Sequence, residues 1–392
     1  MSSQCIPNVL WYLPGHNMVL ALLPLLVLPA VECGRLQVSG DYFVKDGNRV
    51  FLSGVNLGWI KLAYDFGNNQ FAARKSSYER FFKDLHDSGG NSIRIWVHMQ
   101  GDSSPEFDSN GYVIGTDSSG TFLSDIKEVL DLGQKYNILV FFCLWNAAVK
   151  FKYEYRMDGL IRDTGKLTSY LEHALIPWVK SVKDHPSMGG WDIMNEPEGL
   201  IDTGRISSNP CLNATHLIPD GAGWSGKLYN YEDVLRFINW QVDAIRQTDP
   251  GALVTVGSWK PQANTDEYGS HNHYSDHCLI QSGGKPQGVL QFYEMHSYSS
   301  RGQFDYLSPF KHEKREYKLN KPVIVGEFAA KSGGGMTIEA LFQYAYDHGY
   351  RGAWSWSATD SYYGDLWTIQ RQGVASIRYR NDTSTGTVQL TV

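Results

Sequence analysis

Short apolar runs recur along the chain at intervals that suit buried parallel strands. Eight such runs lie between residues 51 and 356. They cover residues 51–56, 92–97, 138–144, 190–194, 253–256, 289–295, 323–326 and 353–356.

Segments with the apolar spacing of helices lie between these runs. In residues 76–87, for example, Phe81, Phe82 and Leu85 fall on one face. The other predicted helices cover residues 122–136, 167–183, 231–247, 309–319, 338–347 and 366–379. Eight strands that alternate with helices over one domain length predict an α/β fold, a (β/α)8 TIM barrel.

The segments outside the barrel have their own patterns. Residues 36–50 alternate apolar and polar positions around the turn dipeptide Asp46-Gly47, which predicts a small N-terminal hairpin. We therefore assign residues 34–380 to one barrel domain and residues 381–392 to a short C-terminal tail. Long loops at 100–120, 199–230 and 260–288 follow strands 2, 4 and 5, so they are expected on the face where such barrels bind ligands.

The N-terminal residues 1–33 predict a secretory signal peptide. Their apolar run, residues 19–30, contains two prolines and is too short to span a membrane as a helix. Cleavage is expected after Ala30 or after Cys33, and a membrane anchor is the alternative. We therefore expect a secreted protein with no membrane attachment after cleavage.

Composition narrows the class of protein. A net charge of −6 gives no basic surface for a nucleic acid, and 12 Trp and 23 Tyr provide many aromatic faces, which suit sugar rings as well as cores. Cys143 lies in an apolar run and is expected to be a buried thiol, whereas Cys211 and Cys278 lie in loops and are either paired or free. Asn213 and Asn381 match the glycosylation pattern.

The strand ends carry the candidate chemistry. The fourth run leads into Asn195-Glu196-Pro197, and the seventh ends at Glu327. Strands 4 and 7 face each other across a barrel of eight, so the two carboxyl groups can flank a bond held over its mouth. Arg94 lies within the otherwise apolar second run and needs an acidic partner.

Two opposed glutamates suit glycoside cleavage with retention of configuration. One protonates the leaving oxygen while the other attacks the anomeric carbon. Arg94 and Tyr298 are expected to hold Glu327 ionised as the nucleophile, and Glu196, which has no cationic neighbour in sequence, is expected to be the acid.

Other side chains at the strand ends are candidates for substrate binding, each with ordinary core packing as the alternative. With Arg94 and Asn195, the predicted substrate-binding set contains His98, Trp145, His296, Tyr298 and Trp356. Three tryptophans in or near the loops can either stack on sugar rings or pack within the protein: Trp59, Trp224 and Trp259. The group His271, His273, Asp276 and His277 lacks a catalytic metal motif, so we interpret it as a polar loop and expect no metal and no cofactor.

Taken together, these motifs resemble glycoside hydrolase family 5 of clan A over about residues 35–379. The segments 54–59, 94–98, 144–146 and 191–199 look like those of endo-β-1,4-mannanases from molluscs and other invertebrates. The resemblance implies Glu196 as acid/base and Glu327 as nucleophile, with Arg94, Asn195, His296, Tyr298 and Trp356 around the cleavage subsite. Many family members have a histidine after strand 3, where this chain has Trp145-Asn146.

The sequence thus predicts a secreted, monomeric, retaining endo-β-1,4-mannanase that acts on mannan, glucomannan or galactomannan. Another β-1,4-glycanase of the family, such as an endoglucanase, is the nearest alternative. A non-catalytic carbohydrate-binding barrel is the alternative from another class, and the presence of both glutamates argues against it.

Overall fold

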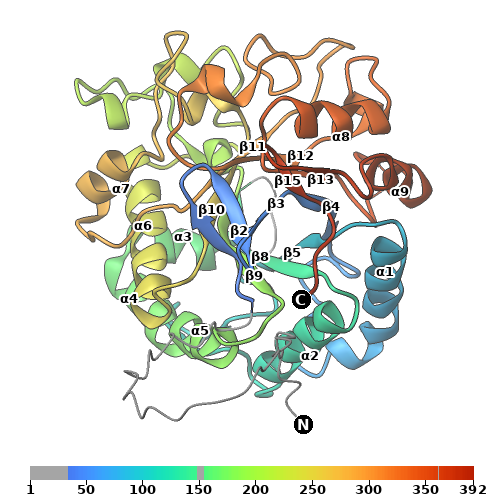
Figure 1. The fold of residues 1–392 in the computed structure, drawn as a ribbon. Coiled ribbons are helices and arrows are strands. Elements are labelled where there is room, and N and C mark those ends of the chain that lie inside the picture. Colours follow the sequence, from blue (N-terminus) through green and yellow to red (C-terminus); the bar gives the residue numbers. More distant parts are fainter. Residues whose placement is uncertain (1–33, 148–153, 361) are drawn as a thin grey trace, which may run out of the picture.

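Eight parallel strands form a closed barrel at the centre of the molecule (Figure 1). The computed structural model describes residues 34–147, 154–360 and 362–392. The barrel strands are β4 (Leu52–Gly58), β5 (Ser92–Met99), β8 (Leu139–Asn146), β9 (Met188–Asn195), β10 (Val254–Ser258), β11 (Tyr293–His296), β12 (Val323–Glu327) and β13 (Gly352–Ser355). They pair in chain order, and β13 closes the barrel on β4. The predicted (β/α)8 fold is confirmed, with the sixth strand starting at Tyr293 instead of residue 289.

Helices surround the barrel (Figure 1). They are α1 (Lys75–Asp87), α2 (Phe122–Lys135), α3 (Glu154–Arg162), α4 (Thr164–Tyr170), α5 (Ile176–Val182), α6 (Tyr231–Thr248), α7 (Asp276–Gly283), α8 (Ile338–Asp347) and α9 (Trp367–Ser376). The helix predicted over residues 167–183 is split into α4 and α5 by a π-helical turn, Leu171–Leu175. Pro177 follows this turn and has no N–H for the regular helical bond, which accounts for the local widening.

The helix predicted over residues 309–319 is wrong, because this segment contains only the 3-10 turn Lys314–Tyr317. The hydroxyl of Ser308 accepts a bond from the Phe310 N–H, which favours a local turn over a helix. Lys318 has a φ of 51°, and this left-handed conformation ends the turn. The helices α3 and α7 were not predicted from the sequence. The N-cap of α7 is Ser275, whose hydroxyl accepts from the Cys278 N–H.

A small sheet covers the end of the barrel where the strands begin. The predicted hairpin is present as β1 (Gln37–Ser39), β2 (Tyr42–Lys45) and β3 (Asn48–Val50). The C-terminal tail adds β14 (Asn381–Asp382) and β15 (Gly386–Thr387), and β15 pairs with β3. In Figure 1 this sheet lies in front of the barrel opening. Its apolar side chains form one cluster with the first residues of the barrel strands, including Phe43, Val50, Leu139 and Trp354.

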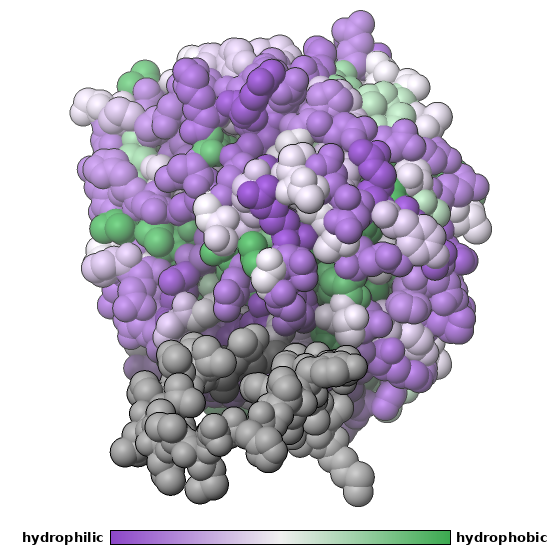
Figure 2. Space-filling view, in the orientation of Figure 1, coloured by the Kyte–Doolittle hydropathy of each residue, from purple (hydrophilic) through white to green (hydrophobic). Residues whose placement is uncertain are grey.

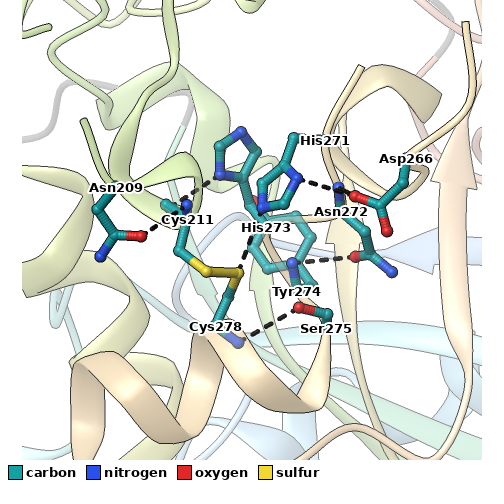
Figure 3. Close-up of a disulfide and its surroundings, with 9 residues drawn as sticks. All are labelled: Asn209, Cys211, Asp266, His271, Asn272, His273, Tyr274, Ser275 and Cys278. Carbon is teal, nitrogen blue, oxygen red and sulfur yellow. Dashed lines mark hydrogen bonds and ion pairs between the residues drawn. A yellow bond between two sulfur atoms is a disulfide. The ribbon is translucent and has the colours of Figure 1, made fainter. Parts of the chain in front are cut away.

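The opposite end of the barrel carries the long loops. The loop after β5 contains a two-stranded ribbon, β6 (Glu106–Phe107) with β7 (Val113–Gly115). A disulfide between Cys211 and Cys278 ties the loop after β9 to α7 (Figure 3). The pairing that the sequence left open is therefore present, and Cys143 is a buried free thiol as predicted.

The surface of the described residues is mostly polar on the face seen in Figure 2, where apolar groups form small separate patches. Within residues 34–147, 154–360 and 362–392, no helix has both the length and the apolar character needed to cross a membrane. The predicted signal peptide, residues 1–33, lies outside the described residues.

Candidate active site

Two glutamates lie at the carboxyl ends of β9 and β12, at the mouth of the barrel. Glu196 follows β9 and has a φ of 49°, an unusual backbone conformation that its N–H bond to the Gly257 carbonyl helps to hold. Pro197 then starts a 3-10 turn, so the strand cannot continue. Glu327 is the last residue of β12. An oxygen of Glu196, an oxygen of Glu327 and a ring nitrogen of His296 all lie within 4.8 Å of one another.

Glu327 is 4% exposed, and both of its oxygens accept hydrogen bonds. Arg94 Nη1 donates to Oε1 at 2.7 Å, and the Tyr298 hydroxyl donates to Oε2 at 2.8 Å. Burial raises the pKa of Glu327 to about 7, although His296, Arg94 and Tyr298 all favour its charged form. The contacts expected to keep Glu327 ionised are present, but desolvation outweighs their effect on the pKa.

Negative charge on Glu196 also raises the pKa of Glu327. When Glu196 carries a proton this contribution disappears, so Glu327 ionises more readily. Arg94 and Tyr298 donate directly to the two oxygens of Glu327, and both contacts favour its charged form.

His296 lies between the two glutamates. Its Nδ1 is 3.0 Å from Glu196 Oε1 and 3.5 Å from Glu327 Oε2. Burial lowers the pKa of His296, but Glu327, Glu196 and Glu294 raise it more, to about 10. The carboxylates around His296 therefore favour its imidazolium form. His296, Glu196 and Glu327 together resemble a metal site in composition, but Arg94 and Tyr298 already occupy the oxygens of Glu327.

Arg94 is fully buried and contacts Glu327. Its guanidinium also donates to Asp192 and to Asn195 Oδ1, the latter at 2.9 Å. Glu294 lies 3.2 Å from its Nε, and Asn56 accepts from Nη1 at 2.9 Å. The arginine thus has the acidic partners that its burial requires.

The sequence reading missed three polar members of this network, Asn56, Asp192 and Glu294. Each is a polar residue inside an otherwise apolar barrel strand. The criterion that selected Arg94 would have selected them too.

Asn195 and Trp356 also reach the mouth of the barrel. The amide nitrogen of Asn195 donates to Asn146 Oδ1 at 3.1 Å while its oxygen accepts from Arg94. Trp356 packs against Trp96 and Trp59, with ring centroids 5.0 and 5.7 Å away, and its N–H donates to Asp360 at 3.2 Å. Arg94, Asn195, Glu196, His296, Tyr298, Glu327 and Trp356 are therefore brought together as the sequence predicted.

His98 and Trp145 do not belong to this group, which corrects their assignment to substrate binding. His98 is 1% exposed and lies among Phe122, Trp145 and Trp178, and its burial lowers its pKa to about 3. The N–H of Trp145 donates to Gln241 of α6, outside the barrel. Both side chains are part of the layer between strands and helices.

Breaks in the simple alternation of side chains explain the error. On β5 the pairing with β8 shifts between Trp96 and Met99, so simple alternation from the inward Arg94 fails before His98. On β8 the inward Cys143 is followed by the inward Asn146, three residues later instead of two. Asn146 therefore takes the place toward the site that alternation assigns to Trp145.

A pair of tryptophans lies on the loops near Glu196. The rings of Trp224 and Trp259 have centroids 4.3 Å apart, and Trp224 is 37% exposed. Glu198 is fully buried below them and accepts from the Trp259 N–H, the Ser258 hydroxyl and the Tyr274 hydroxyl. This buried carboxylate fixes the backbone that carries Trp259.

The histidine-rich segment 271–277 has protein partners of its own (Figure 3). His271 Nδ1 lies 2.8 Å from Asp266, and its Nε2 lies 3.5 Å from the disulfide sulfur of Cys278. Asp276 pairs with Lys321, and His273 is buried with Nδ1 on the Cys211 carbonyl. The sulfur atoms that stand beside His271 are already bonded to each other.

A closed (β/α)8 barrel with two close glutamates over its mouth defines a glycoside hydrolase with a carboxylate pair. The chain belongs to the family described as cellulase, glycosyl hydrolase family 5, whose model matches residues 45–361. The predicted family is thereby confirmed.

Two curated relatives and two solved structures are similar over nearly the whole chain. A mannan endo-1,4-beta-mannosidase of Mytilus edulis is 49% identical over 348 residues, 89% of this chain and 93% of that protein. One of Cryptopygus antarcticus is 39% identical over 91% of this chain and 94% of its own length. The structures of beta-mannanase from Mytilus edulis and beta-1,4-mannanase from Aplysia kurodai have TM-scores of 0.89 and 0.88, with 48% and 50% identity. They cover 92% and 91% of this chain, and each is matched over its whole length.

Proposed function

We infer that this protein is an endo-β-1,4-mannanase that hydrolyses internal bonds of mannan, glucomannan or galactomannan with retention of configuration. One observation carries the mechanism. Oxygens of Glu196 and Glu327 lie within 4.8 Å of each other. Retaining glycosidases hold their carboxyl groups about 5–5.5 Å apart, whereas inverting enzymes need about 6.5–9.5 Å to admit a water. The names of the relatives support the choice of mannan.

The first half-reaction uses both glutamates at once. Glu327 attacks the anomeric carbon, and Glu196 gives its proton to the oxygen of the leaving sugar. Arg94 and Tyr298 hold the attacking carboxylate in place through bonds to separate oxygens. Trp356 offers an aromatic face to the sugar whose bond is cleaved.

The second half-reaction releases the sugar from Glu327. Once Glu327 is an ester its negative charge is gone. Glu196, now ionised, takes a proton from a water molecule while the water oxygen attacks the anomeric carbon. The attack comes from the face that the leaving group vacated, and Glu327 departs as a carboxylate. The side chain of Glu196 is 13% exposed, more than that of Glu327, which fits its contact with the leaving group and with water.

Substrate and stereochemistry are tested on the wild-type enzyme. Reducing ends are measured on galactomannan, glucomannan and carboxymethylcellulose, and the first anomer formed is read by proton NMR. We expect rapid release from both mannans, little from carboxymethylcellulose, and a β product that mutarotates later. Preference for carboxymethylcellulose would identify the endoglucanase alternative, an initial α product would contradict retention, and no release from any polymer would support a binding protein.

Asn195 provides a test of the contact with the sugar. Its amide has two N–H donors and uses one on Asn146, so the second can bind the 2-hydroxyl, which is axial in mannose. We expect Asn195→Ala to lower kcat roughly 10²-fold with little change in KM, because bonds to this hydroxyl strengthen at the transition state. Steady-state kinetics on mannooligosaccharides, with Asn195→Asp as the isosteric control, measure both constants. A higher KM with unchanged kcat would mean uniform binding instead.

The enzyme is also proposed to be a secreted monomer. The Cys211–Cys278 disulfide supports export, since disulfides persist in oxidising compartments. Asn381 is exposed, whereas Asn213 is half-buried and its oxygen accepts from Thr215. Expression of the full chain in a secreting host, with intact mass, N-terminal sequencing and sedimentation of the medium fraction, tests export, cleavage, glycan occupancy and monomeric state. An uncleaved chain retained in the cells would contradict secretion.

A further inference from the structure

A third glutamate lies inside the barrel next to the two already described. Glu294 precedes His296 by two residues on β11, so both side chains point to the barrel interior. Glu294 is fully buried. A carboxylate in such a place is costly unless the surroundings compensate for its loss of water.

The neighbouring strands are shaped around this carboxylate. On β12, a Cβ at Gly326 would come within 2.1 Å of Glu294 Oε1. On β10, a Cβ at Gly257 would come within 2.7 Å of Arg94 Nη2 and 3.1 Å of His296 Nε2. The two strands that flank β11 thus each have a glycine where a larger residue would collide with Glu294, Arg94 or His296.

Glu294 occupies the side of His296 that faces away from the mouth. Its Oε1 is 3.3 Å from His296 Nε2, while Nδ1 on the other side of the ring faces Glu196 at 3.0 Å. A neutral imidazole has one donor and one acceptor nitrogen, whereas an imidazolium donates from both. Carboxylates on both sides of the ring therefore select the imidazolium.

We propose that Glu294 is a positioning residue that keeps His296 doubly protonated, so that His296 donates to Glu196 and does not take the proton that Glu196 must deliver. The proposal rests on the proposed function. If His296 were neutral with its proton on Nε2, the Nδ1 lone pair would face Glu196 and compete with the glycosidic oxygen for the acid proton. As an imidazolium, His296 binds Oε1 of Glu196 and leaves the proton to the other oxygen. Neither proton of His296 moves during the reaction.

Charged and titratable groups on five strands surround this position. They are Arg94 on β5, Cys143 on β8, Asp192 on β9 with Glu196 after it, His296 on β11 and Glu327 on β12. Arg94 Nε is shared between Asp192 at 2.9 Å and Glu294 at 3.2 Å. Removal of the Glu294 charge leaves Arg94 with Asp192 and Glu327, whereas His296 loses the carboxylate at its Nε2.

The test compares Glu294→Gln, which removes the charge with the same shape, with Glu294→Asp, which keeps it. We expect the bell-shaped pH profile of kcat/KM to move to higher pH by about 1 unit or more in Glu294→Gln, because loss of the second proton of His296 removes the positive charge that favours the ionised form of Glu327 beside it. Glu294→Asp is expected to keep both limbs in place with a lower rate. An unshifted profile in a folded Glu294→Gln enzyme would overturn the proposal, since a purely structural role lowers the rate without moving the limbs.

A second measurement does not depend on activity. In the 15N-histidine-labelled wild-type enzyme, the resonances missing from His296→Asn belong to His296. We expect both of its nitrogens to carry protons at pH 7, and a neutral ring there would overturn the proposal. In Glu294→Gln we expect its titration to move down from a pKa near 10. The substrate panel tests the proposed function on the wild type alone, so the two ideas can fail separately.

Discussion

Glu196→Ala is expected to lower the hydrolysis of mannan by about 10²–10⁴-fold while the protein stays folded. The leaving group in a polysaccharide is a poorly acidic sugar hydroxyl, which needs a proton as the bond breaks. Glu196 is the more exposed member of the pair, and its Oε1 lies 3.0 Å from His296 Nδ1. Its removal takes away the proton donor and leaves Glu327 with its two hydrogen bonds intact.

A substrate with an activated aryl leaving group separates this role from general damage. Such a group departs without a proton, so Glu196→Ala should still form the glycosyl-enzyme from an aryl β-mannoside, and added azide should speed its release. The alkaline limb of the pH profile, which reports loss of the acid proton, should vanish for this substrate. Persistence of that limb in the folded variant would contradict the assignment of Glu196 as the acid.

The barrel could be predicted because its signals are local and strong. Parallel strands covered on both faces are continuous apolar runs, and the eight runs in this chain are separated by polar loops and amphipathic helices. The N-terminal hairpin was signalled by Asp46-Gly47, which adopt φ values of 52° and 77° as a tight turn requires. Glu327 was predictable because the apolar run of β12 ends on it.

The remainder depends on features that a single strand does not encode. His98 and Trp145 were placed in the site by alternation, and the register shift that turns His98 outward arises from pairing between strands. The pKa of Glu327 is raised mainly by burial among segments that are distant in sequence. The residues next to Glu327 in the chain do not reveal this burial. Glu294 has a carboxylate that fits only because Gly326 and Gly257 leave space on adjacent strands.

Glu327 is the residue whose loss should have the largest effect. We expect Glu327→Ala to lower mannan hydrolysis by roughly 10⁴-fold or more, since no covalent intermediate can form. Arg94 and His296 then face a space that has lost its anion, because they lie 2.7 and 3.5 Å from the oxygens of Glu327 in the wild type. Azide, itself an anion, should bind there and react with an activated aryl β-mannoside.

The configuration of the azide product distinguishes the two glutamates. In Glu327→Ala, azide attacks from the position of the missing nucleophile, opposite the β leaving group, and a single displacement gives the α-mannosyl azide. In Glu196→Ala, Glu327 attacks first and azide then displaces it from the other face, which gives the β-mannosyl azide. NMR of the isolated products measures this difference, with the wild type as the control that should form neither azide in quantity. The same anomer from both variants would show that one of the two roles is wrong, because two glutamates on opposite sides of the anomeric carbon must give opposite products.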